Sequence, residues 1–488
     1  MTSQSSDGIL IIGAGPAGMA AAHELVQAGQ HVTIVEKADQ IGGLAKTYVY
    51  QEAEGTYRTD NGPHRFFSKN QYLYQMIGGL LGEQWIQVPR FTRFFVDGKF
   101  YNYPVRFRNA LGQMGLLKAV RVLTDYAFER LRAIFHPRRI QSFEDFAVAR
   151  FGRTLAEFNM LNYTEKIWGV PCSRISVDWA SQRIAGLSLW SALKKMLIKK
   201  GGPKTLVDSF YYPDLGSGLV YEHIRQSIEE QGNDVLISTE PTVIHWAGRY
   251  VSHIDVRGAD GTRSFSSKAF ISSVPAPQCV QLFTPAAPDS VLEAATHLRF
   301  RAQVYLFLTI DKDHVTHDNW VYFPNEDIPF ARVSEMKNFS EKMCPPGKTS
   351  LFVEFFCFEG DAIWKASKEE LLEMAMQWLD DRLHFIQRKE VLSVRRTEQP
   401  YAYPIYDIGY QKHVNTIMQW LDSFENFYSI GRPGRFRYTN QDHSLEMGIL
   451  TARGILEGKR YNIDSVGAGQ EYFEQGAVPE QDAQSAKS

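Results

Sequence analysis

The apolar positions at the start of the chain change from a continuous run to a helical period and back again. Residues 8–37, GILIIGAGPAGMAAAHELVQAGQHVTIVEK, predict in order a strand, a glycine-rich turn, a helix and a second strand. Continuous apolar runs are typical of strands that are buried on both faces of a parallel sheet. The segment therefore predicts a parallel βαβ unit and, with it, an α/β fold.

The patterns further along predict other kinds of architecture. Residues 90–104 predict a β-hairpin, and residues 300–360 predict several consecutive strands. Between these two regions, residues 107–200 have a mainly helical pattern, whereas residues 216–232 predict a helix that is followed by strands. A last strand-to-helix unit begins at the segment YSIGRPG and ends near Tyr461. The α/β elements are therefore interrupted by a helical region and by a sheet of consecutive strands.

Composition and charge limit the class of protein and its partners. The chain has 488 residues, 44% of them apolar and 22% charged, as is usual for a large globular protein with more than one domain. The net charge of −2 makes a nucleic acid partner unexpected, so any anion site has to be a local cluster of cations. The four cysteines lack metal-ligand spacing, so we expect no metal site and no disulfide framework. We expect a cytoplasmic protein, because the start MTSQSSDG lacks the basic region of a signal peptide and no run of about 18 apolar residues occurs.

The glycines of the first turn predict a dinucleotide site. Gly13, Gly15 and Gly18 form the pattern GxGxxG between a strand and a helix. The first glycine permits the tight turn, the second lets the backbone approach a pyrophosphate, and the third lets helix and strand pack closely. Glu36 ends the next strand, where an acid accepts hydrogen bonds from ribose hydroxyls and repels a 2′-phosphate.

A second glycine pair indicates which dinucleotide is bound. Gly42 and Gly43 follow Glu36 closely, and this arrangement resembles the glutathione-reductase-type FAD proteins, in which such a pair lets the backbone approach the diphosphate of the flavin. FAD is therefore the expected cofactor, with Gly43 among its contacts.

An FAD site also predicts that a late segment of the chain returns to the flavin. The segment SIGRPGRFRYTNQDHSLEMGI, residues 429–449, begins at the end of an apolar strand and runs into a helical pattern. We expect Gly431, Asp442 and Ser444 to contact the cofactor. Asp442 is expected to cap the last helix, whose N-terminus would then stabilise negative charge on a reduced flavin.

These motifs together resemble the UDP-galactopyranose mutases, within the wider FAD group that includes protoporphyrinogen oxidases and amine oxidases. The resemblance covers most of residues 8–460 and includes GAGPAG and NGPHRFF near the start. Three further segments carry it: NYTEKIWGVPCSRISVDWASQRI (162–184), NWVYFPNEDIPFAR (319–332) and GRPGRFRYTNQDHS (431–444). It implies a glutathione-reductase-type FAD-binding Rossmann domain, an inserted helical domain and an antiparallel sheet substrate domain.

The expected domains follow from combining the patterns with this resemblance. The FAD-binding domain is predicted to comprise residues 1–89, 205–288 and 425–460. The substrate region is predicted to comprise the hairpin 90–104, the helical domain 105–204 and the sheet domain 289–424. Residues 461–488, which are polar and rich in Gly, Ala, Gln and Ser, are predicted to be disordered.

The resemblance implies a site for a diphosphate beside the flavin. Arg332 and Arg432 match diphosphate-binding positions, which suits arginine because its planar guanidinium binds phosphate oxygens bidentately. His64, in the loop NGPHRFF, is expected near the reactive face of the flavin, and we expect these three residues to be the catalytic group. Tyr163 is expected to line the pocket of the base. The predicted substrate-binding residues are Trp168, Arg183, Tyr322, Tyr403, Tyr438 and Asn440.

The activity implied by the resemblance is an isomerisation. In the mutases, N5 of reduced flavin attacks the anomeric carbon of a nucleotide sugar, and the sugar ring closes again as a pyranose or a furanose. No net electrons move, so NAD(P)H or another donor is needed only to reduce the FAD. A role in cell-wall or polysaccharide biosynthesis is implied in the same way. The resemblance leaves open the exact sugar, the nucleotide, the electron donor and the oligomeric state.

Two other functions stay open on the sequence. One is an oxidase or desaturase of the protoporphyrinogen oxidase or amine oxidase type, and the other is a flavin-binding protein without catalysis. The paired arginines favour a diphosphate substrate over an apolar one. The basic and apolar segments LLKAVRVLTDYAFERLRAIFHPRR (116–139) and LKKMLIKKGGPK (193–204) leave peripheral contact with the inner face of a membrane open.

Overall fold

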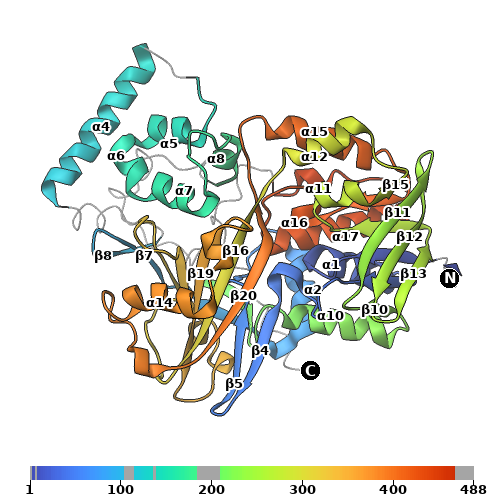
Figure 1. The fold of residues 1–488 in the computed structure, drawn as a ribbon, viewed down its shortest axis with the longest axis horizontal. Helices are drawn as coiled ribbons and strands as arrows, with labels where there is room; N and C mark the ends of the chain where they lie inside the picture. Colours follow the sequence, from blue (N-terminus) through green and yellow to red (C-terminus); the bar gives the residue numbers. More distant parts are fainter. Residues whose placement is uncertain (1–2, 6–7, 104–114, 136–138, 184–208, 468–488) are drawn as a thin grey trace, which may run out of the picture.

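The computed structural model describes residues 3–5, 8–103, 115–135, 139–183 and 209–467, arranged as an α/β fold with both parallel and antiparallel sheets (Figure 1). The predicted helical segment 184–200, the basic segment 193–204 and the predicted disordered tail beyond residue 467 lie outside the described residues. No helix in the described part of the chain is long and apolar enough to cross a membrane.

A parallel five-stranded sheet stands at the centre of one half of the molecule. Its order is β10-β3-β2-β14-β21, and every pairing in it is parallel. The first predicted strand and the second are both present and fully buried, which explains their continuous apolar sequences. The strands are β2 (Ile9–Ile12), β3 (Val32–Val35), β10 (Asp234–Leu236), β14 (Ala269–Ser272) and β21 (Phe427–Ser429).

Helices cover one face of this sheet, and a second sheet covers the other. An apolar core joins β2 and β3 to the helices α1 (Pro16–Gln27), α2 (Gln71–Leu81), α10 (Leu219–Glu230) and α17 (Gln441–Glu457). Another core joins the opposite face to a five-stranded sheet of order β1-β13-β12-β11-β15. Its strands are β1 (Ser3–Ser5), β11 (Glu240–Ala247), β12 (Tyr250–Gly258), β13 (Gly261–Ser266) and β15 (Phe283–Thr284).

The close packing of α1 on α17 depends on a glycine. A Cβ added to Gly448 would lie 2.1 Å from the carbonyl oxygen of Ala17, so no other residue fits there without a shift of the helices. This contact and the ion pair of Arg453 with Glu24, further along both helices, show that α17 runs parallel to α1.

A seven-stranded sheet forms the second half of the molecule. Its order is β20-β16-β19-β18-β17-β7-β8, and α14 (Lys368–Leu379) packs on one face through an apolar core. The predicted hairpin is confirmed as β7 and β8, but β7 pairs with β17 in parallel, so the expectation of a wholly antiparallel sheet is wrong. The strands are β7 (Thr92–Val96), β8 (Lys99–Asn102), β16 (Phe300–Ile310), β17 (Trp320–Tyr322), β18 (Arg332–Glu335), β19 (Thr349–Cys357) and β20 (Val391–Pro404).

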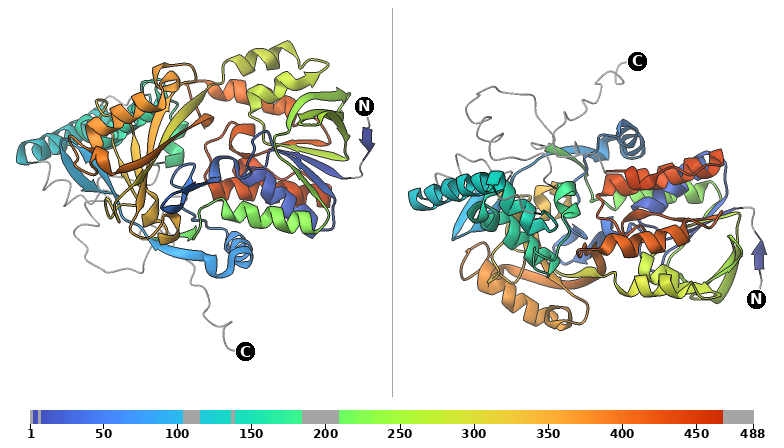
Figure 2. Two further views of the ribbon diagram at one scale, coloured as in Figure 1. Left: turned by 60° about the horizontal axis from the view of Figure 1, so that its bottom comes forward. Right: turned by 90° about the horizontal axis from the view of Figure 1, so that it is seen from above.

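A group of helices lies at one end of the molecule and packs beside the seven-stranded sheet. It comprises α4 (Leu116–Phe135), α5 (Phe143–Phe151), α6 (Arg153–Leu155), α7 (Asn162–Trp168) and α8 (Asp178–Arg183). Both views in Figure 2 place α4 at the end of the molecule opposite to the N-terminus. The helical prediction for residues 107–200 is therefore confirmed over the described part of that range.

The remaining elements connect these layers. Two small antiparallel pairs are formed by β4 (Thr47–Glu52) with β5 (Gly55–Asp60) and by β6 (Trp85–Pro89) with β9 (Ser209–Pro213). The short connecting helices are α11 (Ala276–Cys279), α12 (Asp289–Thr296), α13 (Ala362–Lys365), α15 (Tyr410–Leu421) and α16 (Gly431–Gly434).

Candidate functional site

The two glycine motifs of the sequence meet in space. Gly13 follows β2 with a φ of 102°, and a Cβ there would lie 2.1 Å from Ser273 Oγ. A Cβ on Gly18 would lie 2.0 Å from the carbonyl oxygen of Gly13. Gly43 approaches Gly15 so closely that its Cβ would lie 3.0 Å from the Cα of Gly15. Backbone without side chains therefore surrounds the N-terminus of α1, and this is the geometry that a diphosphate group requires.

Glu36 stands at the border of this glycine surface. Its carboxylate accepts hydrogen bonds of 2.8 Å from the backbone N–H groups of Ala14 and Ala38. Each carboxylate oxygen keeps a further lone pair, since an oxygen of this kind accepts two hydrogen bonds. The side chain is thus held beside the glycine-rich turn with acceptor capacity left for a ribose hydroxyl.

The cap of the last helix lies two residues earlier in the sequence than predicted. Helix α17 starts at Gln441 and its N-cap is Asn440, so the prediction that Asp442 caps the helix is wrong. The N–H of Asn440 donates to His443 Nδ1 at 3.3 Å, which closes the first turn. Asn440 can cap because its own backbone is extended, as an N-cap position requires, whereas Asp442 is already helical.

Asp442 has a different property that bears on a ligand. Its side chain is 2% exposed, and its Oδ2 atom has no hydrogen-bond partner among the described residues. Burial raises the pKa of Asp442 to about 8. A buried polar atom without a partner is costly, so this oxygen at the N-terminus of α17 is suited to a polar group of a bound molecule.

Of the other two predicted cofactor contacts of this segment, Gly431 lies beside the first helix. Gly431 has a φ of 76°, and a Cβ there would lie 3.1 Å from the Cβ of Ala17 in α1. Ser444 is buried, and its hydroxyl bonds with Thr439 Oγ1 at 3.0 Å and with the carbonyl oxygen of Asn440 at 3.2 Å. Both residues shape the turn before α17, and their contact with a cofactor stays a prediction.

A buried aspartate that the sequence analysis overlooked holds the loop of His64. Asp60 is fully buried and accepts hydrogen bonds from Tyr212 OH at 2.7 Å and from the backbone N–H of Ser217 at 2.9 Å. Ser217 Oγ in turn donates to the carbonyl oxygen of His64 at 3.1 Å. Burial raises the pKa of Asp60 to about 6. The available signal was its position, because Asp60 directly precedes the loop NGPHRFF that the sequence analysis had already selected.

Arg332 lies in a row of polar side chains across the seven-stranded sheet. The register pairs it with Tyr322 on β17 and with Glu354 on β19, so the three side chains share one face. This face lies opposite to α14. Arg332 donates to both oxygens of Glu354, from Nε at 2.6 Å and from Nη2 at 2.7 Å, and Glu354 is fully buried. Three N–H bonds of the guanidinium remain for a ligand, two on Nη1 and one on Nη2.

Arg432 follows β21 and lies over two tyrosines. Its Cζ atom is 4.8 Å from the ring centre of Tyr403 and 4.2 Å from that of Tyr438, and these two rings are stacked at 5.4 Å. Its Nε atom is buried and has no hydrogen-bond partner among the described residues. The guanidinium is therefore held between aromatic rings while its Nε donor has no partner among the described residues.

The two arginines, although 100 positions apart in the sequence, act on the same histidine. The pKa of His64 is lowered to about 4, mainly by burial and in smaller part by the positive charges of Arg332 and Arg432. Both charges also lower the pKa of Tyr403, although burial has the larger effect and raises this pKa to about 12. The fold therefore brings His64, Arg332, Arg432 and Tyr403 into one site, in which His64 Nε2 lies 3.2 Å from the carbonyl oxygen of Asn61. The backbone of Leu44, directly after Gly43, also acts on the pKa of His64, so this site borders the second glycine motif.

Three further residues predicted for the substrate pocket lie on the helices α7 and α8. Tyr163 packs edge to face on Tyr322 with ring centres 5.2 Å apart, which places it at the row of Arg332. Trp168 is 1% exposed and packs against Tyr403 and Tyr438, so its indole supports these rings and offers a ligand almost no surface. Arg183 is the last residue of α8, and its side chain lies outside the described residues.

A buried lysine that the sequence analysis did not select holds the loop that leads to Arg332. The Nζ atom of Lys166 in α7 donates to the carbonyl oxygens of Phe323 at 2.7 Å, Asn325 at 2.8 Å and Phe330 at 2.7 Å. Burial lowers the pKa of Lys166 to about 7. Sequence alone gave no signal for this role, because the three acceptors are backbone atoms of a distant loop.

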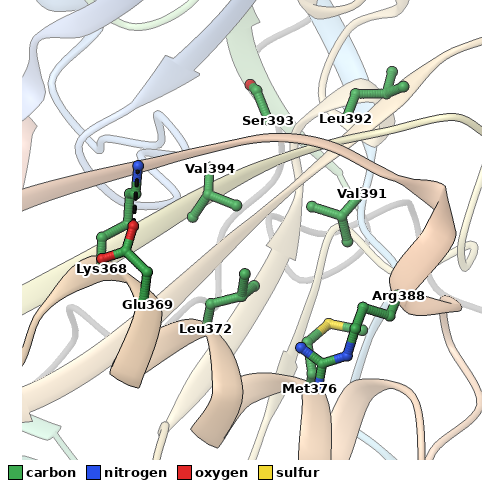
Figure 3. Close-up of a pocket in the computed structure, with 9 residues that line it drawn as sticks. All are labelled: Lys368, Glu369, Leu372, Met376, Arg388, Val391, Leu392, Ser393 and Val394. Atoms are coloured by element: carbon green, nitrogen blue, oxygen red, sulfur yellow. Dashed lines mark ion pairs between the residues drawn. The ribbon is translucent and has the colours of Figure 1, made fainter.

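A pocket of about 310 Å³ lies between α14 and β20 (Figure 3). Its walls include Met376 and Val394, with the ion pair of Lys368 and Glu369 at one side. It opens on the α14 side of the sheet, opposite to the face that carries Arg332. None of the predicted site residues lines it.

One cluster of potential metal ligands exists in the described part of the chain. His245, His253 and Asp255 lie on β11 and β12, with ligand atoms within 4.8 Å of one another. The two imidazole rings are stacked with centres 4.1 Å apart and an angle of 10° between their planes. Imidazole lone pairs lie in the plane of the ring, so those of two parallel stacked rings lie in separate planes and do not converge on one ion in this arrangement.

Comparison with known proteins agrees with this architecture. The sequence profile of a family described as flavin containing amine oxidoreductase matches residues 16–411. A crystal structure of reduced UDP-galactopyranose mutase superposes with a TM-score of 0.80 at 22% identity, covering 96% of this chain and 97% of that one. A structure of putrescine oxidase bound to putrescine superposes with a TM-score of 0.61 at 16% identity, covering 93% and 100%. At these identities the two structures show the fold.

A curated relative is similar over a shorter region. The L-amino-acid oxidase BjussuLAAO-I of Bothrops jararacussu is 37% identical over 76 residues, which make up 16% of this chain and 15% of that protein. The chain thus matches only about a seventh of the length of that relative. The profile match, by contrast, extends over most of the sequence, and the chain therefore belongs to the family of flavin-containing amine oxidoreductases.

FAD is the cofactor of this family and of the mutase. The residues present fit it on two observations. The glycines of α1 and Gly43 leave a backbone cradle that a Cβ would fill, and the buried Oδ2 of Asp442 lacks a partner among the described residues at the N-terminus of α17. The protein is thus an FAD-binding flavoprotein of the amine oxidoreductase type.

Proposed function

We propose that this flavoprotein is a nucleotide-sugar isomerase of the UDP-galactopyranose mutase type that works with reduced FAD. One observation supports the proposal most. Arg332 and Arg432 come from different parts of the chain and both act on His64, which lies beside the second glycine motif. Two cations that converge next to a flavin cradle suit a diphosphate, whereas an apolar substrate or an amine calls for neither.

The cofactor supplies one kind of chemistry in this proposal: reduced FAD offers N5 as a nucleophile toward the anomeric carbon of the sugar. The chain binds the diphosphate leaving group and keeps it close while the sugar rearranges. Arg432 binds one phosphate through the donors that its tyrosines leave unused, and Arg332 binds through the donors that Glu354 leaves unused.

The tyrosines act as neutral donors in this site. Burial raises the pKa of Tyr403 to about 12 and that of Tyr163 well above its usual value, so both keep their protons at neutral pH. Neutral phenols donate hydrogen bonds to phosphate oxygens and add no negative charge. His64 is also neutral at neutral pH, because its pKa is lowered to about 4. Its role in this proposal is to bind and orient the substrate as a neutral imidazole, while the two arginines supply the positive charge.

The test is turnover with the flavin in both redox states. Holoprotein reduced with dithionite is incubated with UDP-galactose, and the pyranose and furanose forms are separated by chromatography. We expect interconversion by the reduced protein only, with no oxygen consumed, and a large loss in Arg432→Ala at unchanged FAD content. No conversion of this or other UDP-sugars by the reduced protein, at full FAD content, would contradict the proposal.

A second candidate is an oxidase, and the comparisons favour it as much as the first. The profile describes amine oxidoreductases, and putrescine oxidase shares the fold. In that case the oxidised holoprotein would take hydride from an amine or an apolar substrate and consume oxygen or a quinone. Flavin bleaching by amines in the absence of oxygen, without any effect of UDP-sugars, would decide for this candidate.

A further inference from the structure

Helix α4 carries a broad apolar face that is exposed to solvent. The side chains Leu117, Val120, Phe128, Leu131, Ile134 and Phe135 are between 50% and 89% exposed. With about 100° between successive residues of a helix, these six positions span an arc of roughly 120° on one side. Figure 1 shows α4 at the outer edge of the helical group.

The opposite side of α4 is the one that packs on the protein. Val122 is 2% exposed and Glu129 is 8% exposed. The carboxylate of Asp125 accepts a hydrogen bond of 3.3 Å from the backbone N–H of Thr154, at the start of the next helices. A Cβ on Gly152 would lie 2.9 Å from the backbone nitrogen of Tyr126. The helix is therefore seated firmly through its acidic side, and its apolar side is left without cover by described residues.

Arginines border the apolar face. On the helical wheel Arg121 and Arg132 lie along one border and Arg130 lies along the other, while Arg139 is exposed just beyond the helix. Arg121, Arg130 and Arg139 form no ion pair with any described residue, and Arg132 lies 3.8 Å from Glu129. The acids of α4 face the protein and its arginines face outward, so the outer surface combines apolar area with positive charge.

We propose that α4 docks this protein on the surface of an anionic lipid bilayer, with the helix axis parallel to the membrane plane. The apolar residues enter the boundary between headgroups and acyl chains, and the bordering arginines bind lipid phosphates. A second copy of the chain fits the same face less well, because a two-fold contact would set the same arginines opposite each other. The proposal concerns a surface remote from the flavin and does not depend on the reaction.

The experiment is co-sedimentation of the full-length holoprotein with vesicles. Pure phosphatidylcholine vesicles are compared with vesicles that also contain phosphatidylglycerol, at low and at high salt. We expect binding to the anionic vesicles that weakens with salt, as for any contact in which charge contributes. The variant Phe128→Gln/Leu131→Gln/Phe135→Gln should bind at least about tenfold more weakly, since three exposed apolar side chains no longer enter the lipid.

Matched variants separate lipid docking from other causes. Val49→Gln/Ile408→Gln removes apolar side chains that are 53% and 50% exposed elsewhere, and it should bind vesicles like the wild type. Arg121→Glu/Arg130→Glu should lose the preference for anionic vesicles. FAD content and thermal midpoint should stay unchanged in all three variants, because the substituted side chains are exposed.

Three results would overturn the proposal. One is equal binding, or none, to both kinds of vesicle. Another is vesicle binding that the triple variant of α4 retains. The third is a concentration-dependent dimer in sedimentation velocity that the triple variant abolishes, which would assign the apolar face to a second copy of the chain.

Discussion

Arg332 and Arg432 reach the same site in different electrostatic states. Arg332 is neutralised by a bidentate ion pair with Glu354, which is fully buried. Arg432 forms no ion pair with any described residue and is held by the faces of Tyr403 and Tyr438. Arg432 therefore contributes most of the net positive charge that a ligand meets, and Arg332 contributes directed hydrogen bonds. Removing Arg332 would also strand a buried carboxylate, whereas removing Arg432 would not.

His64 provides a pH-dependent reporter of a bound diphosphate. Its pKa is about 4 in the folded protein, below the ordinary 6.5, so the unfolded chain binds more protons between these values. The contribution of His64 to stability is therefore complete above about pH 6.5 and is lost as the pH falls toward 4. A diphosphate between the arginines offsets their positive field and raises the pKa of His64. UDP binding should thus take up protons in this range.

The measurement is calorimetric titration of UDP between pH 5 and 7 in buffers of different ionisation enthalpy. The affinity of the wild type relative to His64→Asn should rise as the pH falls, by up to about tenfold for each unit by which the pKa rises. The exposed residue His317 supplies the control His317→Asn, which should titrate like the wild type. Identical proton uptake in His64→Asn would show that UDP does not bind beside His64.

At the scale of single elements, α7 controls the loop between β17 and β18. Lys166 donates three hydrogen bonds to carbonyl oxygens of this loop, whose ends carry Tyr322 and Arg332. The variant Lys166→Met keeps the aliphatic stem but leaves the three carbonyls without this donor. We expect a loss of stability of about 2–4 kcal/mol and weaker UDP binding, with FAD binding retained.

Thermal unfolding and UDP titration of the holoprotein check this expectation. Lys412→Met is the matched control, because Lys412 is exposed on α15, and it should change neither quantity. If Lys166→Met left the affinity for UDP at the value of the wild type, the loop would not position the binding residues.

The elements themselves were largely predictable from periodicity and turn residues. The βαβ start, the hairpin of β7 and β8, the helix α10 and the final strand-to-helix unit all lie where the sequence places them. The cap of α17 was misassigned, because both Asn440 and Asp442 are good capping residues and only the backbone conformation separates them. The parallel pairing of β7 with β17 joins segments about 230 positions apart, and no local pattern encodes it.

At the scale of the whole molecule, the site depends on contacts between distant segments. Arg332 and Arg432 could be selected from the sequence by their chemistry and by the resemblance. Three other features could not be predicted: the ion pair with Glu354, the hydrogen bonds of Asp60 and those of Lys166. They follow from sheet register and from the packing of α7 on a distant loop. The sequence thus proposes which residues bind, and the fold shows which residues hold those side chains in place.

The central claim is that two arginines from separate segments bind one diphosphate beside the flavin. Replacing Arg432 by Ala removes charge without stranding a partner. Replacing Arg332 by Ala strands Glu354 and should cost about 3–5 kcal/mol of stability, whereas Arg332→Gln/Glu354→Gln should recover much of that loss without recovering affinity for UDP. Arg249→Ala, at a side chain that is 68% exposed, is the control for loss of a surface arginine.

The measurement that tests this claim most directly is the affinity of reduced holoprotein for UDP, followed through the flavin absorbance, in these variants. The account predicts that Arg432→Ala weakens UDP binding by about 30-fold or more, as expected for the loss of roughly 2 kcal/mol from a charge-assisted hydrogen bond, while FAD content stays that of the wild type. Equal affinity for UDP in the wild type, in Arg432→Ala and in Arg332→Gln/Glu354→Gln, or loss of FAD in parallel with loss of UDP binding, would contradict it.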